Sequence, residues 1–228
     1  MSGKSELATG FVTRALKHVA NPSKAPAMAA YMKTDMPFFG VQKGGRAVIL
    51  RQLVQDFRPV DRSGYEDLVI GLWALPHREE KYLAIAFARH FEEFVVPASL
   101  PLYRRLIVEG AWWDFVDEVA TNLIRHLVLE HPTQTWPVVE RWIDEPDMWL
   151  RRTAILCQVG AKEKTDAQRL FQFCARRSFE KEFFIRKAIG WALREHARTD
   201  PEAVARFVTE HRQELSGLSF REATKHIG

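Results

Sequence analysis

Residues 180–198 read EKEFFIRKAIGWALREHAR, and this stretch decides how the rest of the chain is interpreted. At 100° per residue, one arc of a helix carries its apolar side chains, which are Ile185, Ile189, Ala192, Leu193 and Ala197. Trp191 falls opposite that arc, in the sector of Lys187 and Arg194. A tryptophan among cations fits a surface that meets a flat, anionic partner such as nucleic acid. Packing against a neighbouring repeat, or a cation–π contact alone, is the alternative for Trp191.

The apolar-basic-basic pattern of this helix occurs twice, 35 residues apart, as Leu150-Arg151-Arg152 and Ile185-Arg186-Lys187. With two helices per unit, that period is typical of a HEAT-like α-solenoid. Helical patterns fill the chain and strands are hard to find. We therefore predict an all-α protein, a single domain over residues 1–228, whose stacked second helices line one concave surface. A globular helical bundle is the alternative.

A second long helix is expected over residues 112–130. Its apolar arc holds Trp112 as a core anchor, while Asp114 is expected on the wet side. Trp113 and Asp117 lie between these two arcs, one turn apart, so their side chains can be neighbours. They are candidates for a functional site. The simpler interpretation is that acids in the first turns stabilise the helix dipole.

Composition limits the possible classes of protein. The chain is 46% hydrophobic and 27% charged, as in a globular protein, and its net charge of +4 is weak evidence for a polyanionic partner. The distribution of charge is more informative. Residues 109–147 hold nine acids and two Lys or Arg, whereas residues 148–198 hold twelve Lys or Arg and five acids.

Several classes of site are not expected. Cys157 and Cys174 form no CxxC motif and are interpreted as reduced core thiols, and the eight histidines show no zinc-binding spacing. We therefore expect no metal and no cofactor. The N-terminal sequence lacks an apolar signal segment, and no apolar run approaches the ~20 residues of a membrane span. A cytoplasmic protein that is not bound to membranes is expected.

The motifs together resemble the AlkD-type DNA alkylation repair glycosylases, in order and over nearly the whole chain. The stretches that carry the resemblance are Trp112-Trp113-Asp114-x-x-Asp117, Trp149-Leu150-Arg151-Arg152-Thr153-Ala154, Phe184 to Glu195, Tyr31-Met32-Lys33 with Pro37 to Val41, and Leu218-Ser219-x-Arg221-Glu222. The chain departs from the family after Gln42, where it reads Lys43-Gly44-Gly45-Arg46 in place of a turn that contains proline. A more flexible DNA-contacting loop is expected there.

The resemblance implies a right-handed solenoid whose concave, basic face holds duplex DNA, and a nucleoid-associated monomer is expected accordingly. It implies hydrolysis of the N-glycosidic bond of N3- and N7-alkylated purines in base-excision repair, with the damaged base left stacked. Trp113, Asp117 and Trp191 match the positions that line the lesion. The expected DNA contacts are Tyr31, Gln42, Lys43, Arg152, Lys187 and Arg194.

This chemistry suits a single acid. An N3- or N7-alkylated purine is already cationic and leaves as a neutral base without a proton from the enzyme. The developing oxocarbenium ion needs a nearby negative charge and an oriented water molecule, and Asp117 can supply both. Two alternatives remain: a non-catalytic HEAT-like module that binds DNA structures, and a protein-interaction solenoid in which Trp191 anchors a peptide.

Overall fold

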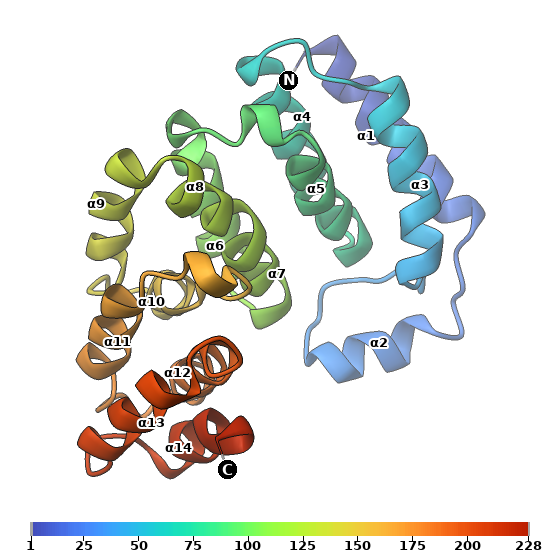
Figure 1. The fold of residues 1–228 in the computed structure, drawn as a ribbon. Helices are drawn as coiled ribbons and strands as arrows, with labels where there is room; N and C mark the ends of the chain where they lie inside the picture. Colours follow the sequence, from blue (N-terminus) through green and yellow to red (C-terminus); the bar gives the residue numbers. More distant parts are fainter. Residues whose placement is uncertain (1, 228) are drawn as a thin grey trace. The chain divides into compact units, whose positions relative to one another are not determined.

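The computed structural model describes residues 2–227, and over that range it is all-helical, without strands (Figure 1). The helices group into two compact units, Met1–Leu102 and Tyr103–Gly228. The all-α prediction is therefore confirmed, whereas the single domain over residues 1–228 stays a prediction. No helix in the described range is long and apolar enough to cross a membrane.

The first unit is a group of helices packed around a shared apolar core. Its helices are α1 (Gly3–His18), α2 (Ala25–Met32), α3 (Lys43–Asp56), α4 (Arg62–Trp73) and α5 (Arg78–His90), followed by the 3-10 turns η1 (Glu92–Phe94) and η2 (Pro97–Ser99). α1 and α5 each pack against α3 and α4. Asp61 caps α4, because its carboxylate accepts a hydrogen bond from the Gly64 amide at 2.7 Å.

The second unit continues from α6 in pairs of helices. Its elements are α6 (Leu100–Gly110), α7 (Trp113–Glu118), η3 (Val119–Ile124), α8 (Arg125–Glu130), α9 (Pro132–Trp142), α10 (Met148–Leu156), η4 (Lys162–Lys164), α11 (Ala167–Arg176), α12 (Phe183–His196), α13 (Pro201–Glu210), α14 (Gly217–Ala223) and η5 (Thr224–His226). Side chains one residue before the helix cap α10, α11 and α13; they are Asp147, Asp166 and Asp200.

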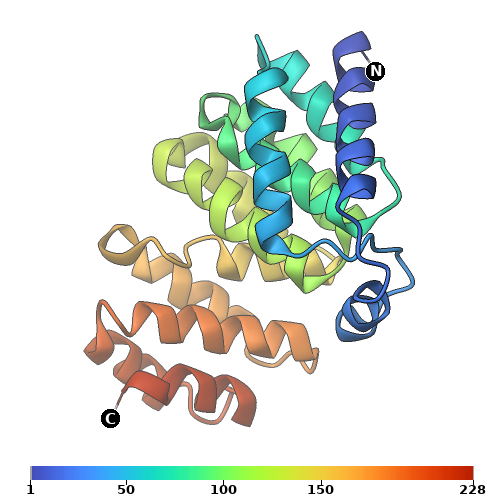
Figure 2. The same ribbon diagram turned by 90° about the vertical axis from the view of Figure 1, so that its right-hand side faces the viewer.

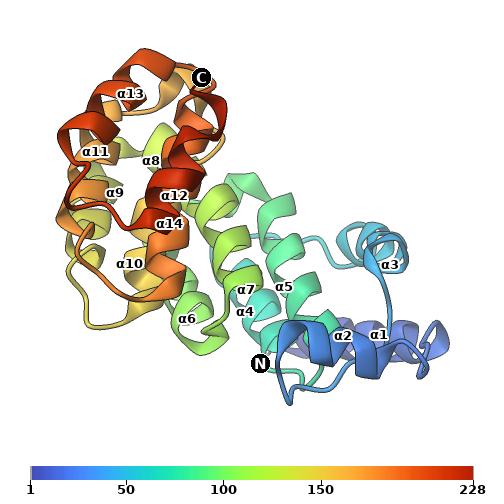
Figure 3. The same cartoon turned by 90° about the horizontal axis from the view of Figure 1, so that it is seen from below.

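The second helices of these pairs begin at a regular interval. α7, α10 and α12 begin at Trp113, Met148 and Phe183, 35 residues apart, and α14 begins 34 residues later. Each packs against the next along this series. They gather on one side of the unit, while α9, α11 and α13 form the other layer (Figures 1 and 3), and Figure 2 shows α12 and α14 stacked. The predicted 35-residue period is thus the spacing between stacked second helices.

The helix expected over residues 112–130 contains a π-helical segment, η3, between α7 and α8. Thr121 Oγ1 donates a hydrogen bond to the carbonyl of Asp117 at 2.7 Å, and Asn122 Nδ2 donates one to that of Glu118 at 2.8 Å. Such side-chain bonds to the preceding turn compete with the regular helical ladder, and π segments are frequent at functional sites. Asp117 therefore lies in the last turn of α7, where the helix widens.

The environment of Asp114 differs from the prediction. We expected it on the wet side of the helix, yet it is buried together with Phe115 and Val116. α7 is six residues long, and the π-helical segment η3 that follows it interrupts the regular helical phase, so the longer periodic pattern does not determine which face of α7 is covered.

Candidate active site

Three second helices of the second unit supply six of the predicted site residues. α7 carries Trp113 and Asp117, α10 carries Arg152, and α12 carries the rest, namely Lys187, Trp191 and Arg194. α10 packs against both α7 and α12, so it lies between the predicted acid and the predicted cationic face.

Asp117 and Arg152 form a bidentate ion pair. Arg152 Nε donates to Asp117 Oδ1 and Nη2 donates to Oδ2, both at 2.8 Å, and Nη1 donates to the carbonyl oxygen of Phe184 at 2.5 Å. The guanidinium therefore joins α7 to the first turn of α12. Two parallel N–H···O bonds fix the orientation of the carboxylate as well as its distance.

Arg152 has a different environment from the one expected of a phosphate contact. Its side chain is 4% exposed, against 14% for Asp117, and each of its three nitrogens has a partner within the protein. These bonds use three of the five N–H groups of the guanidinium, and the burial of the side chain leaves little of the remainder open to a phosphate. In this structure Arg152 acts on Asp117, and its contact with DNA stays a prediction.

Burial changes the acidity of Asp117. Loss of solvent raises the pKa of this carboxyl above its ordinary value of 3.8, and the hydrogen bonds and positive charge of Arg152 oppose that rise. Asp114 and Glu118 add smaller repulsions in the same direction as burial. A carboxylate in this position is only partly hydrated, which strengthens its interaction with a positive charge that develops nearby.

An aromatic cluster lies beside the ion pair. The ring centroids of Trp112 and Phe184 are 5.4 Å apart, those of Trp149 and Phe184 are 5.0 Å apart, and those of Trp112 and Trp149 are 6.1 Å apart. The guanidinium carbon of Arg152 is 5.8 Å from the Phe184 centroid. Trp112, expected as a core anchor of the helix, is instead half-buried and precedes α7 as its extended N-cap residue. Its ring packs in this aromatic cluster, which borders the guanidinium of Arg152.

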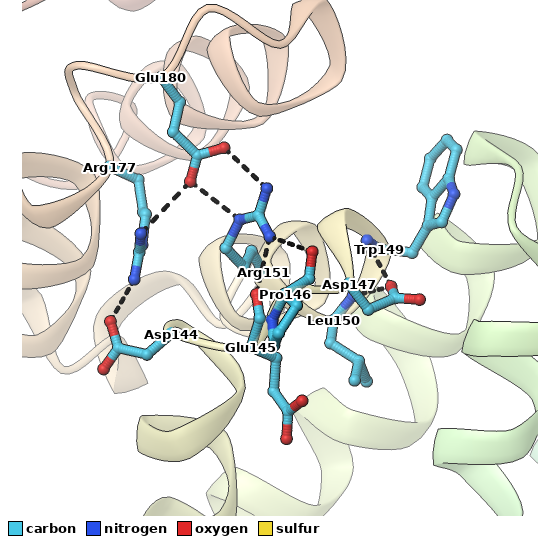
Figure 4. A network of polar contacts seen from close by, with 9 residues as sticks. All are labelled: Asp144, Glu145, Pro146, Asp147, Trp149, Leu150, Arg151, Arg177 and Glu180. Carbon is cyan, nitrogen blue, oxygen red and sulfur yellow. Dashed lines mark hydrogen bonds and ion pairs between the residues drawn. The ribbon is translucent and has the colours of Figure 1, made fainter.

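Arg151, the neighbour of Arg152, points into a separate polar network (Figure 4). It binds Glu180 through two nitrogens at 2.9 and 3.0 Å and donates to the carbonyls of Glu145 and Pro146 at 2.7 Å. Arg177 links Glu180 to Asp144. The two adjacent arginines thus have different roles. Arg151 joins the segment before α10 to the segment before α12, whereas Arg152 holds Asp117, the candidate acid.

Trp113 and Trp191 are both half-buried, so a part of each indole remains open to a ligand. Trp191 shares its face of α12 with Lys187 and Arg194, as the sequence predicted. Both cations bind Glu222 of α14, with Lys187 Nζ 3.0 Å from Oε1 and Arg194 paired to Oε2. From the sequence, Glu222 is part of a family motif and of an expected capping box with Ser219, but the residue that caps α14 is Ser216. Only the tertiary contact of α12 with α14 places Glu222 against these cations.

The remaining predicted DNA contacts lie in the first unit and share one groove. Tyr31 is 73% exposed, and Lys24 Nζ donates to Gln42 Oε1 at 2.9 Å. A cavity of about 510 Å³ is bordered by three cations, Gln42 and aromatic rings, the lining including Lys24, Tyr31, Gln42, Lys43, Arg46 and Tyr82. This groove combines the charge and stacking surfaces that suit a nucleic acid.

The stretch from Lys43 to Arg46 forms the first turn of α3, where a flexible loop was expected. The preceding segment is held by Glu79, whose carboxylate accepts hydrogen bonds from the backbone amides of Phe39, Gly40 and Val41 at 2.8–3.0 Å. Arg46 also donates to the Val41 carbonyl. Glu79 was missed in the sequence, since nothing local marks an acid on α5 as a partner of residues 39–41.

The described residues contain no group of three or more His, Cys, Asp or Glu side chains that could hold a metal ion. Cys157 and Cys174 are free and buried, as predicted for reduced core thiols, and burial raises the pKa of both thiols.

The fold and the site define a helical-repeat protein with a partly buried acid next to an aromatic, basic face. The chain belongs to the DNA alkylation repair enzyme family, whose sequence profile matches residues 12–227. The family resemblance drawn from the sequence is thereby confirmed. A search of curated proteins finds no match.

Solved structures agree with this assignment. A predicted DNA alkylation repair enzyme from Enterococcus faecalis superposes with a TM-score of 0.81 at 29% identity, covering 92% of this chain and 97% of that one. AlkD2 from Streptococcus mutans gives 0.64 at 15% identity, covering 89% and 98%. The protein smu.31 from Streptococcus mutans UA159 gives 0.61 at 15% identity, covering 78% and 91%. The latter two show likeness of fold alone.

Proposed function

We propose that this protein is a monofunctional DNA glycosylase that releases N3- and N7-alkylated purines from duplex DNA. It hydrolyses the N-glycosidic bond as the first step of base-excision repair and acts as a cytoplasmic monomer. The single observation that carries the proposal is the partly buried Asp117 carboxylate, held in one orientation by Arg152 and positioned one turn from Trp113.

The proposed role of Asp117 follows from the charge of the substrate. An alkylated purine that is already cationic leaves with the bonding electrons as a neutral base, and positive charge moves to the deoxyribose. The Asp117 carboxylate stabilises that charge, and its lone pairs left free by Arg152 orient the water that attacks the sugar carbon. Because no leaving-group proton is needed, a second acid is dispensable.

The aromatic and basic groups supply binding. In the proposal, Trp113 and Trp191 contact the damaged nucleotide through their open ring faces, which favour positive character on the sugar. Lys187 and Arg194 bind backbone phosphates without reading sequence. Tyr31, Gln42 and Lys43 add contacts from the groove of the first unit. These groups address sugar and backbone, so we propose that the base stays stacked.

The test is incubation of the purified protein with a duplex that contains N7-methylguanine or N3-methyladenine, followed by detection of the free base. We expect base release that leaves an abasic site in an uncut strand. Asp117→Asn is expected to abolish release and retain DNA binding. Glu109→Gln, which removes an acid from an exposed pair with Arg105, is the control and retains full release.

The other outcomes discriminate between the alternative classes. Salt-sensitive duplex binding without base release indicates a non-catalytic DNA-binding module. A protein that does not bind DNA, but binds an apolar peptide with an affinity that changes little with salt, is an interaction solenoid. Release that survives Asp117→Asn removes Asp117 from the mechanism.

A further inference from the structure

The carboxylate of Glu222 forms ion pairs with three cations. It lies 3.0 Å from Lys187 Nζ and 2.7 Å from Lys225 Nζ, and it is paired with Arg194 through the other oxygen. The Glu222 side chain is 9% exposed, whereas those of Lys187 and Arg194 are 42% and 23% exposed. The acid is therefore covered, while the two cations of α12 that it binds remain accessible.

Gly190 allows this acid to come so close to α12. A Cβ atom added at Gly190 would lie 2.5 Å from Glu222 Cβ and 3.0 Å from the Ser219 carbonyl oxygen. Ser219 Oγ also donates a hydrogen bond to the Arg186 carbonyl at 2.9 Å. The two helices thus meet along a short, fixed contact, which places the Glu222 carboxylate against the face that holds Lys187 and Arg194.

The cations that Glu222 binds are on either side of Trp191 along the helix. Lys187, Trp191 and Arg194 follow one another at spacings of four and three residues, so they form one stripe on α12. Long basic side chains on a helix normally sample many rotamers, and holding each in one rotamer costs conformational entropy. A shared, buried carboxylate holds both before any ligand arrives.

Glu222 remains ionised under all physiological conditions. Its hydrogen bond with Lys225, followed by those of the other cations, lowers the pKa of Glu222 to about 2. One negative charge among three positive ones leaves a net charge of +2 in the cluster. The cluster therefore keeps enough positive charge to attract phosphates, although less than its three cations would carry without Glu222.

We propose that Glu222 is a positioning residue for the DNA backbone: it holds Lys187 and Arg194 at fixed positions beside Trp191 and cancels one of their charges. This inference rests on the proposed function for its catalytic consequence. Fixed cations bind the backbone in the one register that brings a damaged nucleotide to Trp191 and Asp117. Mobile, uncompensated cations bind any duplex more tightly and in many registers.

The experiment compares Glu222→Gln with the wild-type protein in two measurements. The first is the dissociation constant for an undamaged duplex oligonucleotide as a function of salt. We expect tighter binding at low salt and a log–log salt slope that is steeper by about one, since one more cation is available to phosphates. The second is single-turnover base release from methylated duplex, expected to fall about tenfold to a hundredfold through misplacement.

Two further variants separate charge from position and from folding. Glu222→Asp keeps the charge and shortens the side chain, so it should preserve the wild-type salt slope and still slow base release. Glu180→Gln is the matched control, because Glu180 is equally covered and binds two arginines away from the stripe (Figure 4). It should lose stability without changing the salt slope. Circular dichroism gives the folded fraction of each variant.

Opposite changes in binding and release are the signature of positioning, because a merely structural residue would weaken both in proportion to the unfolded fraction. An unchanged salt slope together with unchanged release in Glu222→Gln overturns the inference, as does a proportional loss of both. If Glu222→Gln does not fold, Glu222→Asp with wild-type release overturns it. If the wild-type protein releases no base, the proposed function fails, and the salt slope still tests the placement of the cations.

Discussion

The guanidinium of Arg152 donates two parallel hydrogen bonds of 2.8 Å to the carboxylate of Asp117, and its Nη1 donates a third to the Phe184 carbonyl. The two residues are 35 positions apart, so they occupy the same place in consecutive repeats. Because α7 stacks on α10, two residues that are one repeat period apart in the sequence lie close enough to form an ion pair. The pair gives the candidate acid one orientation, which an acid on an exposed helix would not have.

Arg152→Gln should therefore impair chemistry more than binding. Without the bidentate pair the Asp117 carboxylate loses its fixed orientation, and we expect single-turnover base release to fall about a hundredfold. The dissociation constant for undamaged duplex should change by less than about threefold, with an unaltered salt slope, because Arg152 is buried. Lys187→Gln provides the comparison, since a phosphate contact should lower the slope by about one. A lower salt slope in Arg152→Gln would instead support the phosphate contact that was expected of Arg152 from the sequence.

Base release should depend on pH through Asp117. Protonation removes the negative charge that the sugar cation needs, so the rate falls as pH drops through the pKa of this carboxyl. Because burial raises that pKa, the acid limb should lie above 3.8, and it should move to higher pH in Arg152→Gln, which loses the opposing interaction. Single-turnover rates across pH measure this, corrected for spontaneous depurination and unfolding. An acid limb that does not move in the variant would argue against Asp117 as the titrating group.

How far the sequence predicts this structure depends on the range of the interaction. The repeat period, the helices and the stripe of Lys187, Trp191 and Arg194 follow from local patterns, which determine helix faces. The partner of each charged residue does not. Arg152 and Lys187 occupy equivalent positions in adjacent repeats, yet one is buried against Asp117 and the other is half-exposed beside Glu222. The packing of neighbouring helices determines which of these cations is buried and which carboxylate it binds.

Gly190→Ala should destabilise the protein although alanine is the better helix former. The intrinsic gain of about 1 kcal/mol is outweighed because the new methyl group would lie 2.5 Å from Glu222 Cβ and 3.0 Å from a backbone carbonyl. Gly44→Ala is the matched control within α3, where an added Cβ meets nothing within 4 Å, and it should be neutral or stabilising. Urea unfolding of both variants measures the difference, and equal effects would contradict the close approach of α14.

Glu222 should make the stability of the fold dependent on acid pH. Its folded pKa of about 2 is below the ordinary 4.5, so the carboxylate binds protons more weakly in the folded state than in the unfolded one. The resulting stabilisation is complete above pH 4.5 and is lost as pH falls towards 2. The difference in unfolding free energy between wild type and Glu222→Gln should therefore shrink over that window. A difference that is constant with pH would mean that the ion pairs contribute nothing.

Glu79→Gln should destabilise the first unit more than its single-atom change suggests. The wild-type carboxylate is fully buried and accepts three backbone N–H groups, whereas a glutamine would direct one NH₂ group at donors that it cannot satisfy. We expect a loss of about 2 kcal/mol or more in the free energy of unfolding. Hydrogen exchange of the Phe39, Gly40 and Val41 amides should accelerate, since these are the groups that lose their acceptor.

The matched control for Glu79 is Glu93→Gln, which alters an exposed pair with Arg58 and should change stability by no more than about 0.5 kcal/mol. Because the anchored segment leads directly into Gln42 and Lys43, Glu79→Gln should also weaken binding of undamaged duplex while Glu93→Gln does not. Loss of stability without faster exchange at residues 39–41 would show that Glu79 supports the core of the first unit rather than this segment. Faster exchange with unchanged duplex binding would instead remove Gln42 and Lys43 from the proposed DNA contacts.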